Sequence, residues 1–196
     1  MTLQAYRDKR DFRRTPEPSG DNAAASEAPL FVIQKHDAST LHYDFRLEVD
    51  GALKSWVVPK GPSTDPRERR LAQPTEDHPL DYADFEGIIP EGEYGAGTVL
   101  VWDRGPYRNL RRDQDGGGTS MQQALDEGKV EVWLDGQKLQ GGYALIRIDD
   151  ADDRWLLIKM EDDRADARRN PTHTEPKSVL SGRTLDDIAA EADAGS

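Results

Sequence analysis

The stretch KHDASTLHYDFRLEVDG, residues 35–51, decides the fold, because it contains an unbroken alternation of apolar and polar side chains. From Leu41 to Val49 every second residue is apolar. A period of two predicts a β-strand with one face in a core. The residues on the other face are His42, Asp44, Arg46 and Glu48. That face is either a solvated surface or part of a functional site, and other features of the sequence are needed to distinguish the two.

Short runs rich in β-branched and aromatic residues recur from Leu30 to Met160. They are separated by turn signals such as VDGA at 49–52, PKGPS at 59–63 and WLDGQ at 133–137. Strands at this spacing, with little helix between them, predict an antiparallel sandwich or barrel. Two helices are predicted from their capping residues, within TSMQQALDEG at 119–128 and TLDDIAAEA at 184–192. The fold class is therefore mainly β.

The composition limits the class of protein. A chain of 196 residues suits one domain with tails, and without cysteine any bound metal must be held by His, Asp or Glu. No apolar run approaches the roughly 20 residues that cross a bilayer, and the start MTLQAYRDKRDFRR lacks the apolar stretch of a signal peptide. We expect a cytoplasmic protein with no membrane partner.

The charge is strongly negative but unevenly distributed. The net charge of -12 argues by itself against a nucleic-acid partner, because phosphate binding draws on Lys and Arg. Half of it lies from Asp149 onward, where thirteen acidic and seven basic residues give a net of -6. The first fourteen residues and PKGPSTDPRERR at 59–70 are basic instead. Two basic patches on an acidic protein can still guide a polyanion to one place.

The chain divides into three predicted parts. Residues 1–29 are an N-terminal arm and linker, because TPEPSGDNAAASEAP at 15–29 is rich in Pro, Ser, Ala and Gly, which is typical of a linker and not of a packed element. Residues 30–160 contain the predicted strands and form the functional domain. Residues 161–196 form an acidic C-terminal segment with a short helix.

Histidines concentrate around the quoted strand. Polar strand faces are commonly only solvated, so a site needs further support. Three of the four histidines, His36, His42 and His78, fall in two polar motifs, whereas His173 lies in the polar loop PTHTEP. His42 and Asp44 project from one face about 7 Å apart along the strand. A bend at 37–40 can bring His36 to the same point.

Two imidazoles and one carboxylate form a recognisable set of ligands. Such a set suits a divalent metal such as Mn, Fe, Zn or Co, and it leaves positions open for water or a substrate oxygen. Arg46 lies one step further along the same face and would be a fork-shaped donor to a phosphate beside the metal. The sequence therefore predicts a metal site at His36, His42 and Asp44 that binds a phosphate group.

A second polar motif is RRLAQPTEDHPLDYADFEG at 69–87. His78 directly precedes a proline, which restrains it to an extended conformation. Glu76, Asp77, Asp81 and Tyr82 surround it in sequence and can tune its pKa. His78 is therefore predicted to be a supporting or acid–base residue of the same site.

A third motif is the glycine-rich IPEGEYGAGTV at 89–99. It lacks the GK[ST] ending of a phosphate-binding loop, and no helix is predicted after it. Tight turns and strand bends are the favoured interpretation of its glycines.

Taken together, these motifs resemble the 3′-phosphoesterase domain of bacterial DNA ligase D, which also occurs as a free-standing protein. The resemblance rests on YRDKRDFRRTPEP, FVIQKHDASTLHYDFRLEVDGALKSWVVPKGPS, EDHPLDYADFEGIIPEGEYGAGTVLVWDRG, WLLIKMED and SVLSG. It covers residues 6–182, and QKH, LHYDFRLE and EDHPLDY are its most specific parts.

The resemblance implies a small antiparallel β-barrel with a few short flanking helices. It implies a manganese-dependent enzyme that heals DNA 3′ ends during double-strand break repair by non-homologous end joining. Such an enzyme removes a 3′-terminal ribonucleoside as a phosphodiesterase, and then the 3′-phosphate as a phosphomonoesterase, to leave a 3′-hydroxyl. Mn²⁺ is the implied cofactor, and Co²⁺ or Zn²⁺ would suit the same site. The implied partners are DNA 3′ ends in primer-templates, with a DNA ligase, a polymerase or a Ku-like end-joining protein.

The resemblance also gives roles to individual residues. The matched metal ligands are His36, His42 and Asp44, and the matched contacts of the scissile phosphate are Arg46 and His78. Further active-site positions are matched by Lys60, Arg70, Glu76 and Tyr82, and in the arm by Arg10, Asp11 and Glu17. The arm is therefore expected to fold back over the site.

One departure from the family pattern lies between Arg70 and Glu76. Gln73 and Pro74 stand where the family continues a strand-like LAV pattern, and proline lacks the N–H of a ladder hydrogen bond. The departure bears on the placement of Arg70 relative to His78 and not on the metal site.

Two alternatives from other classes stay open at the level of sequence. A non-haem Fe(II) oxygenase would use His42, Asp44 and His78 as a facial triad. A non-catalytic DNA-end-binding repair module would bind DNA without metal-dependent turnover.

Overall fold

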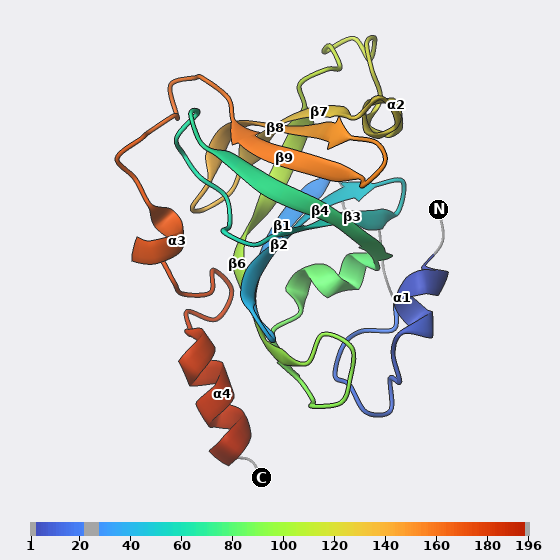
Figure 1. Cartoon of the computed structure of the whole chain (residues 1–196), viewed down its shortest axis with the longest axis vertical. Coiled ribbons are helices and arrows are strands. Elements are labelled where there is room, and N and C mark those ends of the chain that lie inside the picture. Colours follow the sequence, from blue (N-terminus) through green and yellow to red (C-terminus); the bar gives the residue numbers. More distant parts are fainter. Residues whose placement is uncertain (1–2, 22–27, 195–196) are drawn as a thin grey trace.

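The computed structural model describes residues 3–21 and 28–194 of the chain. Its strands are β1 (Leu30–Asp37), β2 (Leu41–Val49), β3 (Ala52–Val58), β4 (Arg69–His78), β5 (Gly87–Ile89), β6 (Gly97–Asn109), β7 (Lys129–Asp135), β8 (Gln140–Asp149) and β9 (Arg154–Lys159). Its helices are α1 (Gln4–Asp8), the 3₁₀ helix η1 (Leu80–Asp84), α2 (Met121–Glu127), α3 (Pro171–Thr174) and α4 (Leu185–Ala194). The described chain is mainly β, as the sequence predicts (Figure 1).

Eight strands close into an antiparallel barrel. The order is β1-β2-β3-β4-β9-β8-β7-β6, and β6 pairs back onto β1. The long strand β6 makes this closure possible, because its first part pairs with β1 and β5 and its last residues pair with β7. Closure leaves the eight barrel strands without a free edge.

The two faces of β2 meet different surroundings. The alternating apolar residues from Tyr43 to Val49 point into the barrel core, where they pack with side chains such as Phe31, Trp102 and Leu134, whereas Leu41 at the start of the strand is exposed. The other face lies on the outside of the barrel, yet Asp44, Arg46 and Glu48 are buried as well. This polar face is therefore covered and is not a solvated surface, so its charges need partners within the protein.

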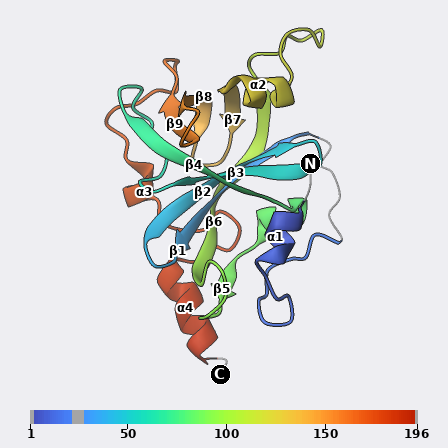
Figure 2. The same cartoon turned by 45° about the vertical axis from the view of Figure 1, so that its right-hand side comes forward.

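The cover over this outer face comes from the N-terminal arm and η1. Tyr6 of α1 packs with Leu80 and Tyr82 of η1 and with Val32 of β1 in a second apolar cluster. Both views of the chain show α1 beside η1, below the β3–β4 side of the barrel (Figures 1 and 2).

The predicted linker at 15–29 is packed at its start. The side chains of Thr15 and Glu17 are buried, although the stretch has the composition of a linker. The reason is that both polar groups find partners: the Thr15 hydroxyl donates to Glu17, and Glu17 binds Arg10. The part of the predicted linker at 22–27 lies outside the described residues.

Pro74 lies within β4 and does not end the strand. The reason lies in the change of partner along β4. Residues 69–72 of β4 pair with β9, and residues 73–78 pair with β3. Pro74 lies just after this change, where a missing ladder donor is tolerated.

Both predicted helices are present and capped as expected. Ser120 and Gln123 form a capping box at the start of α2, and Gly128 ends it in a left-handed conformation. Thr184 and Asp187 exchange the corresponding hydrogen bonds at the start of α4. Within the described residues, none of the helices combines the length and apolarity that a bilayer crossing requires.

Candidate metal and phosphate site

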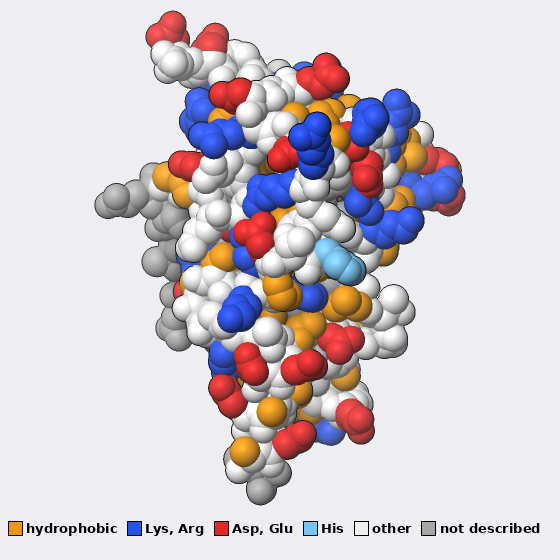
Figure 3. Space-filling model, turned by 90° about the vertical axis from the view of Figure 1, so that its left-hand side faces the viewer, with side chains coloured by type: hydrophobic (Ala, Val, Ile, Leu, Met, Phe, Trp, Pro, Cys, Tyr) orange, Lys and Arg blue, Asp and Glu red, His pale blue; other side chains and the backbone are white. Residues whose placement is uncertain are grey.

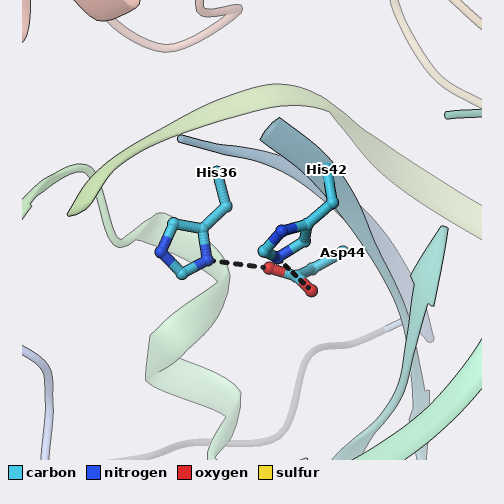
Figure 4. Close-up of side chains that lie close together, drawn as sticks. All are labelled: His36, His42 and Asp44. Atoms are coloured by element: carbon cyan, nitrogen blue, oxygen red, sulfur yellow. Dashed lines mark ion pairs between the residues drawn. The ribbon is translucent and has the colours of Figure 1, made fainter. Parts of the chain in front are cut away.

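Three side chains converge near the turn of the β1–β2 hairpin. His36 near the end of β1 and His42 near the start of β2 are opposite each other in the strand register, and Asp44 follows on the same face of β2. His36 Nδ1 lies 3.5 Å from Asp44 Oδ2, and His42 Nε2 lies 3.4 Å from Asp44 Oδ1 (Figure 4). The possible ligand atoms all lie within 4.8 Å of one another.

Backbone carbonyls fix the orientation of both imidazoles. His36 Nε2 donates to the carbonyl oxygen of Gly95 at 2.7 Å, and His42 Nδ1 donates to that of Thr40 at 3.0 Å. A carbonyl oxygen only accepts, so each ring carries a proton on the nitrogen that faces the backbone. In the neutral rings the other nitrogens, which face Asp44, keep their lone pairs. This is the arrangement in which metal-binding histidines are held in proteins.

Charge at this cluster is strongly favoured on Asp44. Burial alone would raise its pKa, but the Arg46 cation and the two neighbouring histidines hold the pKa of Asp44 far below its usual value. Burial opposes charge on His42, but Asp44 outweighs it and raises the pKa of His42. A buried carboxylate that is ionised at neutral pH, beside two imidazole nitrogens, fits a divalent cation of the Mn, Fe, Co or Zn group.

Arg46 lies beside this cluster, and its side chain is 3% exposed. Its Nε donates to Gln34 Oε1 at 2.7 Å, and its Nη2 lies 3.5 Å from Asp44 Oδ2. The Gln34 amide in turn donates to the backbone carbonyls of Tyr82 and Phe85 at 2.9 and 3.1 Å. Gln34 therefore links the guanidinium to the segment around η1 and fixes its direction.

His78 completes the inner wall of the site. Its Nδ1 lies 2.9 Å from the carbonyl oxygen of Glu76 and 3.2 Å from Arg46 Nη1. Burial and then the Arg46 cation hold the pKa of His78 well below its usual value. His78 is therefore neutral at pH 7, and the tautomer that bonds the Glu76 carbonyl has its acceptor at Nε2.

The N-terminal arm forms the opposite wall through buried ion pairs. Arg10 Nε lies 2.9 Å from Glu17 Oε2, and Arg10 Nη1 lies 3.3 Å from Glu76 Oε1. Tyr82 Oη donates to the same Glu17 carboxylate at 2.8 Å. The arm is thus joined to β4 and η1 by a network in which Arg10, Glu17 and Glu76 are each at most 4% exposed at the side chain.

Comparison with known proteins bears on the identity of this site. The family model described as the DNA Ligase D 3′-phosphoesterase domain matches residues 34–147, which include every residue of the metal cluster. The chain belongs to this family. The multifunctional non-homologous end joining protein LigD of Pseudomonas aeruginosa is 51% identical over 189 residues, which cover 93% of this chain and 22% of that protein. The multifunctional non-homologous end joining DNA repair protein LigD of Mycobacterium tuberculosis H37Rv is 44% identical over 163 residues, which cover 83% of this chain and 20% of that protein. The chain therefore spans about a fifth of the length of the curated relatives that it matches.

Most residues to which the 3′-phosphoesterase resemblance gave roles line one cavity of about 210 Å³. These are Arg10, His36, His42, Asp44, Arg46, Glu76, His78 and Tyr82. Glu17 lies directly behind them, against Arg10 and Tyr82. The structure thus brings together residues that are up to 72 positions apart, from Arg10 to Tyr82.

Three predicted site residues lie elsewhere. Lys60 and Arg70 line a separate hollow, in which Arg70 forms an ion pair with Glu68 at 2.7 Å. Asp11 accepts hydrogen bonds from its exposed neighbour Arg13 and does not line the cavity. As the structure stands, their part in the active site rests on the family resemblance alone.

The ligand set of the oxygenase alternative is not assembled. Among the described residues the group that could hold a metal is His36, His42 and Asp44, and His78 is not part of it. His78 Nδ1 is occupied by the Glu76 carbonyl and faces Arg46. A cation next to His78 opposes a second cation bound to it.

Gln34 is the site residue that the sequence interpretation missed. A usable signal was present, because Gln34 stands two residues before His36 and so shares its strand face. The register places Gln34 opposite Asp44. Gln34 is the first polar residue after the apolar run LFVI at 30–33, and it lies on the same strand face as His36. It was therefore a candidate for the same site.

Proposed function

We propose that this chain is a manganese-dependent phosphoesterase that heals DNA 3′ ends. It would remove a 3′-terminal ribonucleoside as a phosphodiesterase, and then the 3′-phosphate, to leave a ligatable 3′-hydroxyl. The observation that carries the proposal is the buried cluster of His36, His42 and Asp44 with Arg46 at its side, in a chain of the 3′-phosphoesterase family.

The chain's own residues suggest how the work is divided. His36, His42 and Asp44 would hold the metal, which when bound supplies a Lewis acid for a phosphate oxygen. Arg46 presents a guanidinium that Gln34 orients, and it would neutralise charge that builds on the phosphate. His78, neutral and held through Nδ1, would exchange a proton with the reacting group at Nε2.

The arm would close the site from the side of Arg10. The buried Arg10 cation is balanced by Glu17 and Glu76. Arg10 thereby positions these carboxylates and, through Glu17, the Tyr82 hydroxyl around the cavity. A closed wall of this kind excludes water, which strengthens the electrostatic effect of Arg46 on a bound phosphate.

The setting that we propose is double-strand break repair by non-homologous end joining, as in the names of the relatives. Those relatives contain the corresponding domain within a much longer chain. A DNA ligase, a polymerase or a Ku-like protein would then supply the neighbouring steps, either in the same chain or as partners.

The decisive experiment is a gel assay with a 5′-labelled primer that ends in a ribonucleotide, annealed to a DNA template. We expect Mn-dependent shortening through a 3′-phosphate to a 3′-hydroxyl, and no shortening with EDTA or with Asp44→Ala. Tight Mn-independent binding without turnover would instead favour the DNA-end-binding module. Consumption of oxygen and 2-oxoglutarate with Fe(II), without phosphate release, would favour the oxygenase.

A further inference from the structure

Tyr94 is an exposed aromatic residue at the rim of the site. It lines the same cavity as the metal cluster, yet 46% of its surface is exposed. Most other large aromatic residues of the described chain are buried in one of the two apolar clusters. An open aromatic ring beside a phosphate-binding centre is a surface on which a planar apolar group can pack.

The position of Tyr94 is fixed relative to the metal cluster. The carbonyl of the next residue, Gly95, accepts the hydrogen bond from His36 Nε2. Two tight turns shape the loop on either side, from Glu93 N to the Pro90 carbonyl and from Ala96 N to the Glu93 carbonyl, both at 3.1 Å. The backbone that carries the Tyr94 ring is therefore tied directly to a metal ligand.

The arm supports the ring from one side. Lys9 Nζ lies 4.7 Å from the ring centroid and Arg10 Cζ lies 5.4 Å from it. The same loop is joined to the arm by an ion pair between Arg14 and Glu93 at 3.0 Å. These cations each have a carboxylate partner, because Lys9 and Arg10 also contact Glu76. The Tyr94 side of the cavity therefore offers an aromatic surface with compensated charge.

The side of the metal cluster that faces β3 differs in charge from the Tyr94 side. β1 and β2 carry the ligands, and the Tyr94 loop precedes β6, which pairs with β1. On the far side β2 pairs with β3 as far as Tyr43 and Val58, so the pairing ends one residue after His42, and Pro59 follows Val58. The exposed Lys60 follows directly. A polyanionic strand is thus favoured on the Lys60 side, and an uncharged group on the Tyr94 side.

We infer that Tyr94 stacks against the terminal nucleobase that the diesterase step releases. This inference rests on the proposed function and names a specificity-determining residue for its first step. The 3′-phosphate product no longer contains that nucleoside, so Tyr94 contributes to diester cleavage and not to phosphate removal.

The test compares two substrates and two variants. A tenfold effect on kcat/KM corresponds to about 1.4 kcal/mol, which lies within the range of about 1–3 kcal/mol for stacking of one base on an aromatic side chain. We expect Tyr94→Ala to lower kcat/KM about tenfold on a primer with a 3′-ribonucleoside and less than about twofold on a 3′-phosphate primer. Tyr94→Phe keeps the ring and should match the wild type on both. Ile148→Ala changes an exposed apolar residue on β8 and is the matched control.

A third substrate isolates the base itself. Replacing the terminal nucleoside by an abasic ribose should lower the wild-type kcat/KM by a factor similar to that of Tyr94→Ala, and should leave the variant unaffected. The role of Tyr94 would be overturned if Tyr94→Ala lowered kcat/KM equally on the diester and the monoester substrate. It would also be overturned if the variant kept the wild-type kcat/KM on the diester. A wild-type protein inactive on both substrates with Mn would instead contradict the proposed function.

Discussion

Arg46 is the residue on which the charged outer face of β2 depends. Its guanidinium contacts Gln34, Asp44 and His78 at the same time, and burial removes water as an alternative partner. A buried charge without its partner is destabilising by several kcal/mol, whereas a balanced cluster is tolerated. The planar fork of arginine reaches Gln34 through Nε and Asp44 through Nη2 at the same time, which a lysine ammonium cannot do.

The prediction is a graded decrease of stability at Arg46. We expect Arg46→Met to lower the free energy of unfolding by about 3 kcal/mol, because Asp44 stays buried without its cation. Arg46→Lys keeps the charge but not the fork, and should lower it by about 1–2 kcal/mol. Both should abolish phosphatase activity. Urea denaturation of the metal-free proteins measures the stabilities.

Arg104→Met is the matched control for this series. Arg104 pairs with Asp84, whose side chain is 68% exposed, so the change should stay within about 0.5 kcal/mol. Wild-type stability in Arg46→Met would mean that the histidines alone stabilise the Asp44 carboxylate.

At the scale of elements, the arm is held to the barrel by charge more than by apolar area. α1 contributes Tyr6 to the apolar cluster, and Glu17 then accepts hydrogen bonds from Arg10, Thr15 and Tyr82. Removing the Glu17 carboxylate leaves these buried donors without this acceptor. The local opening of the arm should therefore become easier while the barrel stays folded.

Limited proteolysis measures this opening, because the arm contains several trypsin sites at Arg7, Lys9, Arg10, Arg13 and Arg14. We expect Glu17→Ala to speed cleavage within 7–14 by at least about tenfold, since Arg10 then stays buried without this partner. Asp21→Ala removes an exposed ion pair with Arg7 at 3.8 Å and an exposed hydrogen bond from the Ser19 hydroxyl, and it should leave the rate unchanged. An unchanged rate in Glu17→Ala would show that the Tyr6 packing alone retains the arm.

The elements also differ in how much of their structure and of the site can be predicted from the sequence. The alternation of β2 predicted the strand and the pair of His42 and Asp44, because i and i+2 side chains share a face. His36 was added because a bend at 37–40 can bring it to the same point. The same reasoning could not find that Glu17, in a stretch with linker composition, lies against Tyr82. Nor could it separate Lys60 and Arg70 from the cavity. Such contacts depend on how distant segments pack, and a local pattern carries no information about that.

The β7–β8 turn contributes a pH-dependent element of stability. Asp103 accepts the backbone N–H groups of Gln137, Lys138 and Leu139 in this turn. Lys138 extends into the protein and donates to the carbonyl of Glu175 at 2.9 Å, which joins the C-terminal segment to the barrel. Burial lowers the pKa of Lys138 from 10.5 to about 8.

The sign of the resulting pH dependence follows from the bound protons. Between pH 8 and pH 10 the unfolded chain keeps a proton on Lys138 that the folded protein releases, so stability rises with pH in this window. Well below pH 8 Lys138 is protonated in both the folded and the unfolded state, so it adds no pH dependence to the free energy of unfolding. We expect Lys138 to contribute a gain of up to about 2 kcal/mol between pH 8 and pH 10, which appears as the difference between the wild type and Lys138→Met. Urea midpoints at about pH 7.5 to 10 measure it.

The exposed Lys129→Met is the control and should keep the wild-type slope. The difference between the wild type and Lys138→Met is the quantity to measure, because burial also raises the pKa of tyrosines such as Tyr107 and Tyr143. Their effect has the opposite sign and amounts to about 0.4 kcal/mol for each tyrosine at pH 10, but it is present in both proteins. An equal slope in the wild type and in Lys138→Met would assign the pH dependence to other groups.

At the scale of the whole molecule, positive charge gathers on one side despite the net charge of -12. The loop at 59–70 and the segment at 164–169 are joined, because the Thr64 hydroxyl donates to the carbonyls of Asp166 and Arg169 at 2.7 and 3.1 Å. Figure 3 shows Lys and Arg side chains over the upper part of this side and Asp and Glu side chains over the lower part. Within the described residues, Lys60, Arg69, Arg164 and Arg168 form no ion pair. This side begins next to His42 and so continues the proposed path of the DNA strand.

The prediction is that this side binds the phosphates of the duplex behind the 3′ end. The triple variant Arg69→Gln, Arg164→Gln and Arg168→Gln leaves the cavity intact, so kcat on a 3′-phosphate primer-template should be unchanged. Its affinity for duplex DNA should fall, and the slope of log K against log[salt] should drop by about 0.9 for each arginine that binds a phosphate in the wild type, up to about 2.7. Fluorescence anisotropy between about 50 and 200 mM salt, concentrations in the range where this slope is informative, measures it.

A matched triple variant on the α2 side of the barrel, Arg108→Gln, Arg112→Gln and Arg154→Gln, separates location from total charge. Both variants remove three positive charges and make the net charge equally more negative. If overall repulsion set the affinity, both would weaken binding alike. Weaker binding in the first variant alone would locate the duplex on the side that adjoins His42, and equal weakening in both would contradict a DNA path over this face.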